Sequence, residues 1–235
     1  MITIVSFKWK KDDSGYRLNS GTYTADHVNK LFRSLKRNST IPFRFVCVTD
    51  DKSGIDSDIE IIDLWDKCRN LGGCYNRLYI FSQDMKNIFG DRFLTIDLDC
   101  VVVGNIDSIL TRNEDFLINK FIGKGNLNQK YNGSLIMMNS GARETVWSRF
   151  NFDESAKYLD NIRTSRLLIG SDQAWIQTIL GENEITFSDS DGIYDYSFLP
   201  DRQVLPDNAK IIFFPGRVDP SAQSEHVDWI KTYWR

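Results

Sequence analysis

Short apolar runs and longer amphipathic segments alternate along this chain. Apolar runs at residues 2–7, 43–51 and 59–65 each end in polar or turn-forming residues, which is typical of buried strands. Between the first two runs, four apolar residues at helical spacing predict one buried helix face: Val28, Leu31, Phe32 and Leu35. This alternation predicts an α/β domain with a mostly parallel central sheet flanked by helices.

The second half of the chain continues the alternation. Its most apolar predicted strand contains two aspartates near its carboxyl end, and the helix after residue 170 has Ser171 as its expected N-cap. We find no repeat or linker, so the 235 residues predict one domain over residues 1–235. The remaining predicted elements are helices at 75–85, 171–180 and 226–234 and strands at 92–107, 133–141 and 210–216.

Composition and charge narrow the class of partner. The net charge is -3 and the basic residues are scattered, so a nucleic-acid partner is not expected. The first apolar run is too short for a signal peptide, and no later stretch approaches the ~20 apolar residues of a membrane helix. We therefore expect a soluble, cytoplasmic protein without a membrane span. Its four cysteines lack CxxC spacing and are expected to be reduced, structural thiols rather than disulfide or zinc ligands.

Asp97 and Asp99 are the candidate chemical centre. Residues i and i+2 of a strand point to the same face, so the two carboxylates can converge. Two neighbouring carboxylates repel one another unless a cation lies between them, and oxygen ligands suit Mg²⁺ or Mn²⁺. Ligands of open parallel sheets bind beyond the carboxyl ends of the strands, where this pair lies. The alternative is structural: one aspartate caps the turn at Gly104 and the other forms a surface salt bridge.

Six segments of the sequence resemble a known enzyme family. They are FVCVTDD, GGCYNRLYIF, FLTIDLDCVVVGNID, MMNSG, GSDQAWI and FFPGRVDP, and they occur in the order found in GT-A glycosyltransferases of the family 8 type, particularly compact bacterial and viral relatives. The resemblance spans nearly the whole chain and implies the GT-A (Rossmann-like, nucleotide-diphospho-sugar transferase) fold. It also implies a metal-dependent hexosyltransferase that moves a sugar from a nucleotide-sugar, expected to be a UDP-sugar, with retention. The acceptor, whether glycan, protein or small molecule, is not specified.

The resemblance also assigns residues to the metal and the diphosphate. Asp97 and Asp99, with Leu98 between them, would bind Mn²⁺ (or Mg²⁺) together with the diphosphate of the donor. Arg77 matches a basic residue that neutralises donor oxygens or pairs with the first aspartate, although an ordinary surface arginine is the alternative. Asn76 beside it is a weaker candidate.

Further positions are assigned to the donor sugar. Asn139 and Ser140, which end the predicted strand at 133–141, match residues that contact this sugar, although a turn cap explains Asn139 almost as well. Asp172 and Gln173 match the pair that grips the sugar hydroxyls near the anomeric carbon, and with Arg77 they are the catalytic candidates. The alternative for Asp172 is a favourable interaction with the helix dipole.

The first strand and its loop match the segment that holds the nucleotide base. An aromatic ring can stack on uracil and a lysine can approach phosphate, so Phe7, Lys8, Trp9 and Tyr16 are candidates. Trp9 is equally compatible with a core position.

The sequence departs from the resembled family at its C-terminal motif, H-F-x-G-x-x-K. Phe213 stands at the metal-binding histidine and Asp219 at the diphosphate-binding lysine. Gly216 and Arg217 from the same loop are expected to contact the donor, with Arg217 supplying the lost positive charge. His27 is expected to pack or cap its helix, and nothing in the spacing brings His226 near Asp99.

Two other functions remain open at this point. The motif hhhhDxD is also the nucleophile signature of HAD-like phosphatases, although these usually carry it near the N-terminus and need a later lysine and acidic pair. The missing histidine and lysine also favour a non-catalytic or hydrolysis-only sugar-nucleotide-binding protein. A non-catalytic binder differs from a transferase because it would bind a UDP-sugar without hydrolysing or transferring it.

Overall fold

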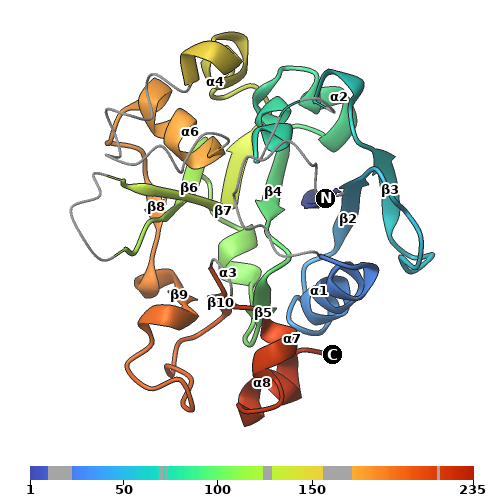
Figure 1. Cartoon of the computed structure of the whole chain (residues 1–235), viewed down its shortest axis with the longest axis vertical. Helices are drawn as coiled ribbons and strands as arrows, with labels where there is room; N and C mark the ends of the chain where they lie inside the picture. The colour runs from blue at the N-terminus through green and yellow to red at the C-terminus, as the bar shows by residue number, and fades with distance from the viewer. Residues whose placement is uncertain (10–22, 69–70, 72–73, 124–128, 156–170, 216–217) are drawn as a thin grey trace.

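Seven strands form a central sheet in the order β3-β2-β1-β4-β7-β6-β8 (Figure 1). The computed structural model describes residues 1–9, 23–68, 71, 74–123, 129–155, 171–215 and 218–235. The strands of this sheet are β1 (Ile2–Lys8), β2 (Phe43–Thr49), β3 (Glu60–Asp63), β4 (Arg92–Ile96), β6 (Phe116–Lys120), β7 (Tyr131–Asn139) and β8 (Thr186–Phe187).

The direction of each strand decides which residues share an edge of the sheet. β1 is parallel to β2 and β4, β2 is parallel to β3, and β6 is parallel to β8. β7 is antiparallel to both of its neighbours, β4 and β6. The predicted mostly parallel sheet is therefore confirmed, and β7 is the reversed strand among the seven.

A second, three-stranded sheet lies beside the first. It contains β5 (Cys100–Val102), β10 (Ile211–Phe213) and β9 (Ile193–Asp195); β10 pairs antiparallel with β5 and parallel with β9. The prediction of one continuous strand at 92–107 is therefore wrong, because the chain leaves the large sheet after β4 and enters the small sheet at β5. The residues between these strands are 97–99, so the aspartate pair lies where the two sheets meet.

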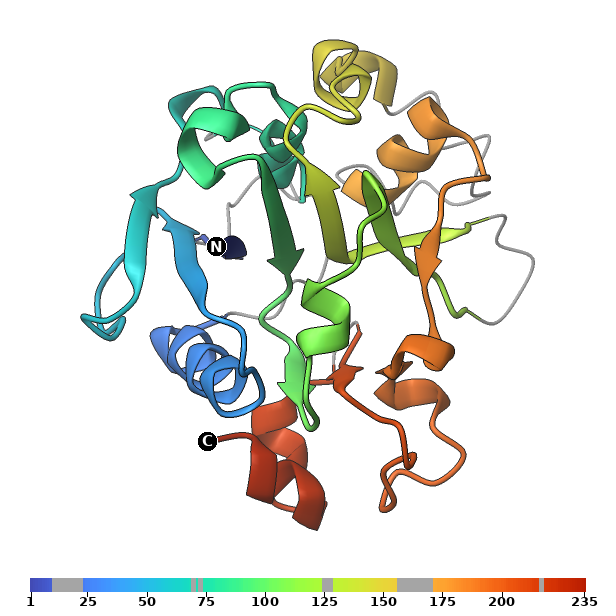
Figure 2. The ribbon, with the colours of Figure 1, turned by 180° about the vertical axis from the view of Figure 1, so that it is seen from behind.

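The helices cover both faces of the large sheet (Figures 1 and 2). On one face the apolar side of α1 packs against the core that contains Ile4, and on the other η2, α4 and α6 pack against the core that contains Val5. Adjacent residues of β1 thus point to opposite faces, as strand geometry requires. The helices are α1 (Ala25–Arg37), α2 (Met85–Phe89), α3 (Asp107–Leu110), α4 (Thr145–Ser148), α6 (Asp172–Leu180), α7 (Pro220–Gln223) and α8 (Asp228–Tyr233), and the 3₁₀ helices are η1 (Asp66–Cys68), η2 (Tyr75–Phe81), η4 (Asp189–Asp191) and η5 (Tyr196–Phe198).

Most predicted elements are found, with differences in detail. The buried face of α1 is confirmed, and Ser171 occupies the N-cap position of α6. The predicted helix at 75–85 is instead the 3₁₀ helix η2, which ends at the extended Ser82 before α2 begins. All four cysteines are free. Every helix in the described part of the chain is too short or too polar to cross a bilayer.

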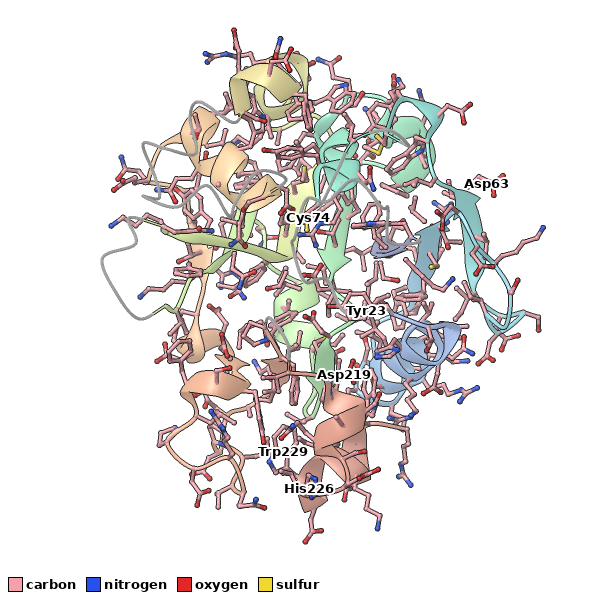
Figure 3. The ribbon with its side chains drawn as sticks, viewed as in Figure 1. Tyr23, Asp63, Cys74, Asp219, His226 and Trp229 are labelled. Carbon is pink, nitrogen blue, oxygen red and sulfur yellow. The ribbon has the colours of Figure 1, made fainter. Side chains whose placement is uncertain are left out.

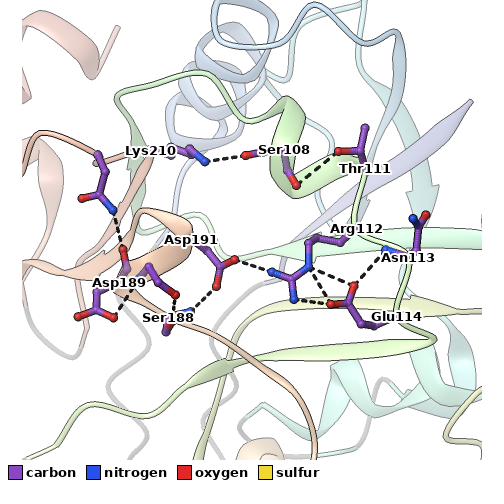
Figure 4. A network of polar contacts seen from close by, with 11 residues as sticks. Ser108, Thr111, Arg112, Asn113, Glu114, Ser188, Asp189, Asp191 and Lys210 are labelled. Carbon is purple, nitrogen blue, oxygen red and sulfur yellow. Dashed lines mark hydrogen bonds and ion pairs between the residues drawn. The ribbon is translucent and has the colours of Figure 1, made fainter.

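A network of polar side chains joins the two sheets (Figure 4). Arg112, just before β6, donates to Glu114 and to Asp191 of η4. Nearby, Lys210 Nζ donates to Ser108 Oγ across 2.6 Å, which links the residue before β10 to α3. The Arg112–Asp191 contact thus links the segment before β6 of the large sheet to η4, which precedes β9 of the small sheet.

Candidate active site

The aspartate pair is held by backbone hydrogen bonds to two other segments. The Asp97 amide donates to the Ser134 carbonyl of β7, and the Phe214 amide donates to the Asp99 carbonyl, each across 2.8 Å. Between them Leu98 is 1% exposed and packs in the core. Because the Leu98 side chain lies in the core, the aspartates on either side of it stay partly exposed. The two carboxylates are close enough for the charge of Asp97 to raise the pKa of Asp99, although residues 97–99 are not part of a strand.

Arg77 joins two of the predicted site residues. It projects from η2, pairs with Asp97 through Nη1, and donates from Nη2 to Asp172 Oδ2 across 2.6 Å. Its side chain is 12% exposed and that of Asp172 is 5% exposed, so this contact is shielded from water. The predicted pairing of Arg77 with the first aspartate is confirmed. The second contact, with the first residue of α6, was not predicted.

Gly133 makes room for this ion pair. A Cβ atom added at Gly133 would lie 2.8 Å from Asp172 Oδ2 and 3.0 Å from Arg77 Nη2. The Gly133 amide donates to Gln173 Oε1 across 3.2 Å, which fixes the side chain next to Asp172. Sequence analysis missed Gly133, although a glycine inside an apolar strand often marks a close approach of other groups.

The site concentrates negative charge. Burial, opposed by Arg77, raises the pKa of Asp97 to about 6. Burial and the neighbouring Asp97 raise the pKa of Asp99 to about 7. Burial and the nearby Asp172 also raise the pKa of the Cys74 thiol to about 12, so Cys74 presents a neutral thiol to the site. Asp97 retains 29% exposure of its side chain, and a ligand from solvent can therefore reach it.

Tyr23 is a second residue that sequence analysis missed. It lies just before α1, and it is close enough to Asp99 for the two side chains to shift each other's pKa. Burial, together with the charges of Asp99 and Asp97, raises the pKa of the Tyr23 hydroxyl above its usual range. Figure 3 labels Tyr23 and Cys74 in the middle of the molecule. Tyr23 falls outside the six resembling segments, so no pattern in the sequence pointed to it.

The residues at the C-terminal motif positions make contacts that differ from those of the resembled family. The Phe213 side chain is 2% exposed and packs in the same core cluster as Leu98. Asp219 accepts a hydrogen bond from His27 Nε2 across 3.1 Å. The expected packing and capping role of His27 is confirmed, because its ring also caps α1 through Thr24. His226 is exposed near α8, far from Tyr23 in Figure 3. Gly216 and Arg217 lie outside the described residues.

The predicted contact of Asn139 and Ser140 with the donor sugar requires a correction. Both lie at the carboxyl end of β7, where Asn139 pairs with Arg92 at the amino end of β4. Because β7 is antiparallel to β4, this is the edge opposite to Asp97. Asn139 Oδ1 accepts from Arg92 Nη1 across 2.7 Å, and Ser140 Oγ donates to the Gly90 carbonyl across 2.5 Å. The amino end of β7, with Gly133, faces the site instead.

The candidates for base binding lie in and after β1. Phe7 is buried and meets Trp9 edge to face, with ring centroids 6.2 Å apart. Lys8 is also buried, and its Nζ donates to the Asp51 carbonyl across 2.6 Å. The expected stacking therefore depends on Trp9, which is half-buried, and the expected phosphate contact of Lys8 requires it to leave Asp51. Tyr16 lies outside the described residues.

The donor atoms at this site fit a hard divalent cation. Asp97 and Asp99 supply carboxylate oxygens, which repel one another when no cation lies between them. Mg²⁺ or Mn²⁺ commonly binds only one or two protein carboxylates together with substrate phosphates. Among the described residues no group of three or more His, Cys, Asp or Glu side chains is arranged to hold a metal. A protein-only cage is thus absent from that part of the chain, and a phosphate-bearing ligand would complete the coordination.

Comparisons with known proteins identify the fold. No protein-family model matches the chain, and no curated protein matches it. Among solved structures, the galactosyltransferase LgtC in complex with donor and acceptor sugar analogs aligns with a TM-score of 0.59 and 12% identity over 100% of this chain and 97% of that chain. GlyE from Streptococcus pneumoniae TIGR4 aligns with a TM-score of 0.60 and 12% identity over 94% of this chain and 56% of that chain. The chain has the GT-A glycosyltransferase fold.

The GT-A fold is also shared with part of a larger enzyme. The bifunctional glycosyltransferase WbbM aligns with a TM-score of 0.55 and 13% identity over 93% of this chain and 46% of that chain. This chain therefore spans about half the length of GlyE and WbbM. At these identities the likeness concerns the fold and does not single out family 8. It gives no support to the HAD-like phosphatase alternative.

Proposed function

We propose that this chain is a glycosyltransferase that moves a sugar from a UDP-sugar to an acceptor hydroxyl, with Mn²⁺ or Mg²⁺ as cofactor and with retention. The observation that supports it best is the bridge that Arg77 makes between Asp97 and Asp172. This bridge brings η2, the end of β4 and the start of α6 to one point, beside Asp99. The GT-A fold of the chain is that of the galactosyltransferase LgtC, which was solved with donor and acceptor sugar analogs.

Each residue of the bridge has a role in this proposal. Asp97 and Asp99 hold the cation, which when bound neutralises the charge that develops on the departing diphosphate. Arg77 keeps Asp97 oriented and balances the charge of Asp172. Asp172 and Gln173 offer carboxylate and amide groups to the hydroxyls of the donor sugar. The Gly133 amide helps to orient the Gln173 side chain for this role. One of the solved LgtC structures is of an active-site mutant in which a glutamine is replaced by glutamate.

A front-face transfer fits these residues better than a double displacement. A nucleophilic carboxylate must turn an oxygen toward the anomeric carbon, whereas Asp172 is held by Arg77 through Oδ2 and is 5% exposed, which suits a hydrogen bond to the sugar better than an attack on it. In a front-face transfer the acceptor hydroxyl approaches from the side of the leaving diphosphate, which takes up its proton. Such a reaction requires from the protein only binding, charge balance and exclusion of water.

The experiment is a pair of substitutions at the cation site with a matched control. Asp97→Ala and Asp99→Ala are each expected to abolish Mn²⁺-stimulated UDP release from UDP-sugars. Asp63→Ala is the control, because Asp63 is exposed on the edge strand β3. Full metal-stimulated release by either site variant would refute the direct role of that carboxylate.

A non-catalytic sugar-nucleotide-binding protein is the second candidate. It is favoured by the replacement of the motif histidine by the buried Phe213 and of the lysine by Asp219, which pairs with His27. A thermal-shift panel of nucleotides and UDP-sugars with and without Mn²⁺ first identifies the ligand, since a ligand stabilises the folded state by mass action. A UDP-sugar that raises the melting temperature but is neither transferred nor hydrolysed would establish this candidate in place of the transferase.

A further inference from the structure

The ladder between β6 and β7 is interrupted at the edge of the sheet that faces the site. Ile118 of β6 pairs with Ile136 of β7. The next residue of β6, Asn119, pairs with Asn132, so the register skips residues 133–135 and β7 forms a β-bulge there. The two strands lie side by side in Figure 1, next to α6. Bulges are over-represented beside active sites, where they redirect side chains.

The bulge reverses the alternation of side chains along β7. Leu135 packs in the core on the α1 face and Ile136 in the core on the opposite face, so a regular strand would direct residue 133 to the α1 face. Instead, a Cβ added at Gly133 would lie 2.8 Å from Asp172 Oδ2 and 3.0 Å from Arg77 Nη2, on α6 and η2 of the opposite face. The bulge thus turns a residue without a side chain toward the ion pair.

Three backbone groups of the bulge form hydrogen bonds outside the ladder with β6. The Gly133 amide donates to Gln173 Oε1 across 3.2 Å, and the Ser134 amide donates to Asn132 Oδ1 across 2.9 Å. The Ser134 carbonyl accepts from the Asp97 amide across 2.8 Å. Because buried backbone polar groups need partners, these contacts make the break in the ladder tolerable. They also connect the bulge to two residues of the candidate site.

Asn119 joins the two strands at the point where their register shifts. Its Nδ2 donates to Ser134 Oγ across 2.9 Å, and the two residues are only 8% and 5% exposed. A hydrogen bond that is shielded from water is electrostatically stronger than an exposed one. The side chain of Asn119 therefore holds the bulge where the ladder does not.

The shape of the bulge sets the direction of the Gln173 amide. A backbone N–H can only donate, so the atom of Gln173 that faces Gly133 is Oε1. Nε2, on the other branch of the amide, is then the atom that can donate to an oxygen of a ligand. Gln173 is half-buried, so a ligand can reach it. With the carboxylate of Asp172 beside it, the pair offers one donor and one acceptor to neighbouring sugar hydroxyls.

We propose that Asn119 is a positioning residue of the donor-sugar site, which holds the bulge of β7 so that Gln173 directs Nε2 at a hydroxyl oxygen of the sugar. This inference rests on the proposed function. Asn119 acts through Ser134 and Gly133, from the β6 side of β7. Asp97 is held from the β4 side, where the pairing is regular, so the cation site keeps its shape when the Asn119 contact is lost.

The test compares two measurements in the wild type, Asn119→Ala and Ser134→Ala. One is the Mn²⁺ concentration that half-saturates the thermal stabilisation of the protein by UDP, which reports on the cation site without a sugar. The other is kcat/KM for Mn²⁺-dependent UDP release from UDP-galactose, UDP-glucose and UDP-N-acetylglucosamine. Each variant is expected to lose about tenfold or more in kcat/KM, as misplaced binding groups do, and to titrate with Mn²⁺ like the wild type. Ser134→Ala removes a single oxygen atom and serves alone if Asn119→Ala does not fold.

A double-mutant cycle tests whether Asn119 and Ser134 act as one unit. The double variant is expected to lose no more kcat/KM than the more affected single variant, because all three lack the same hydrogen bond. Thr3→Val is the matched control: it removes a buried hydroxyl that donates to the Phe89 carbonyl across 2.7 Å, at the amino end of β1. It is expected to lower the melting temperature and to keep the kcat/KM and the Mn²⁺ titration of the wild type.

The outcomes separate the inference from the proposed function. Wild-type protein that turns over a UDP-sugar, together with variants that have the same kcat/KM, overturns the inference and leaves the proposed function intact. Additive losses in the cycle overturn it too, because Asn119 and Ser134 would then act independently. So do equal losses in kcat/KM and in the Mn²⁺ titration, which indicate a merely structural role. Wild-type protein that releases UDP from none of the three UDP-sugars overturns both.

Discussion

A Cβ atom added at Gly133 would lie 2.8 Å from Asp172 Oδ2, so the glycine and the carboxylate leave no room between them for a methyl group. The other close atom, Arg77 Nη2, is also the end of a side chain. Gly133→Ala should therefore displace the ion pair at small cost to folding. We expect donor-dependent activity to fall about tenfold or more, in line with the cost of a misplaced catalytic group, while the melting temperature changes little.

Gly104→Ala provides the contrast. A Cβ there would lie 2.5 Å from the Ala209 carbonyl oxygen, which belongs to the backbone and cannot rotate away. We expect a loss of about 1–3 kcal/mol in the free energy of unfolding, measured by urea denaturation.

The outcome that would contradict the Gly133 prediction is wild-type activity in Gly133→Ala. It would show that the position of Asp172 is unimportant for the reaction.

Arg77 is expected to matter for both stability and activity. Arg77→Ala leaves Asp97 and the buried Asp172 without their cation, and removal of one partner of a buried ion pair typically costs about 3–5 kcal/mol. Arg77→Lys keeps the charge but has no planar fork to reach both carboxylates, so it should fold better than Arg77→Ala and still lose most activity. Urea unfolding and UDP release measure the two effects.

The control for Arg77 is Arg44→Lys, which alters an exposed pair with Glu60. Exposed pairs contribute about 0–1 kcal/mol, so little change is expected in either measurement. If Arg77→Lys retained the stability and the activity of the wild type, the bridge between Asp97 and Asp172 would have no functional importance.

The sequence predicted much of the fold and the centre of this site. The spacing of apolar residues identified α1 and most strands, and the paired aspartates and Arg77 are together as expected. What the sequence did not reveal was strand direction: residues 131–139 have the same apolar pattern whichever way β7 runs. Because β7 is antiparallel to β4, Asn139 is remote from Asp97 and Gly133 is close to the ion pair.

Residues that reach the site from another part of the fold were also hidden. Tyr23 comes near Asp99 because α1, which follows it, packs against β5, and neither the local pattern around Tyr23 nor its spacing from Asp99 indicates this. The same holds for the pairing of His27 with Asp219, which are 192 residues apart. Such contacts depend on the tertiary arrangement and follow from no local motif.

The raised pKa values of the aspartates predict how stability depends on pH. The pKa values of Asp97 and Asp99 lie above that of an unfolded aspartate, so the folded state binds protons more tightly than the unfolded state. Their contribution to stability is fully present below about pH 4 and is lost as the pH rises through 6 and 7. We expect the melting temperature without metal to fall over this range, and Mn²⁺ with UDP to reduce the fall.

Two variants test which carboxylates cause this dependence of the melting temperature on pH. Asp99→Asn should flatten the part of the profile near pH 7, because the amide does not titrate. Asp195 is another aspartate, in the small sheet, whose pKa burial raises to about 6, and Asp195→Asn should change only the lower part of the range. A profile of Asp99→Asn identical to that of the wild type would mean that Asp99 does not titrate there.

Phe213 offers a final prediction, on whether the missing motif histidine can be restored. The Phe213 ring is 2% exposed, and its backbone pairs with Cys100, one residue beyond Asp99. A histidine at this position would bury an imidazole among apolar side chains of the same core cluster as Leu98. An unpaired buried polar group costs about 1–3 kcal/mol, so Phe213→His should lower the midpoint of urea unfolding without increasing the affinity for Mn²⁺.

Phe213→Leu, which stays apolar, separates the loss of ring volume from the cost of burying polar atoms. Tighter Mn²⁺ binding by Phe213→His, measured by the same thermal titration with UDP, would instead show that the side chain at 213 can turn toward the aspartates and that the site tolerates a third protein ligand.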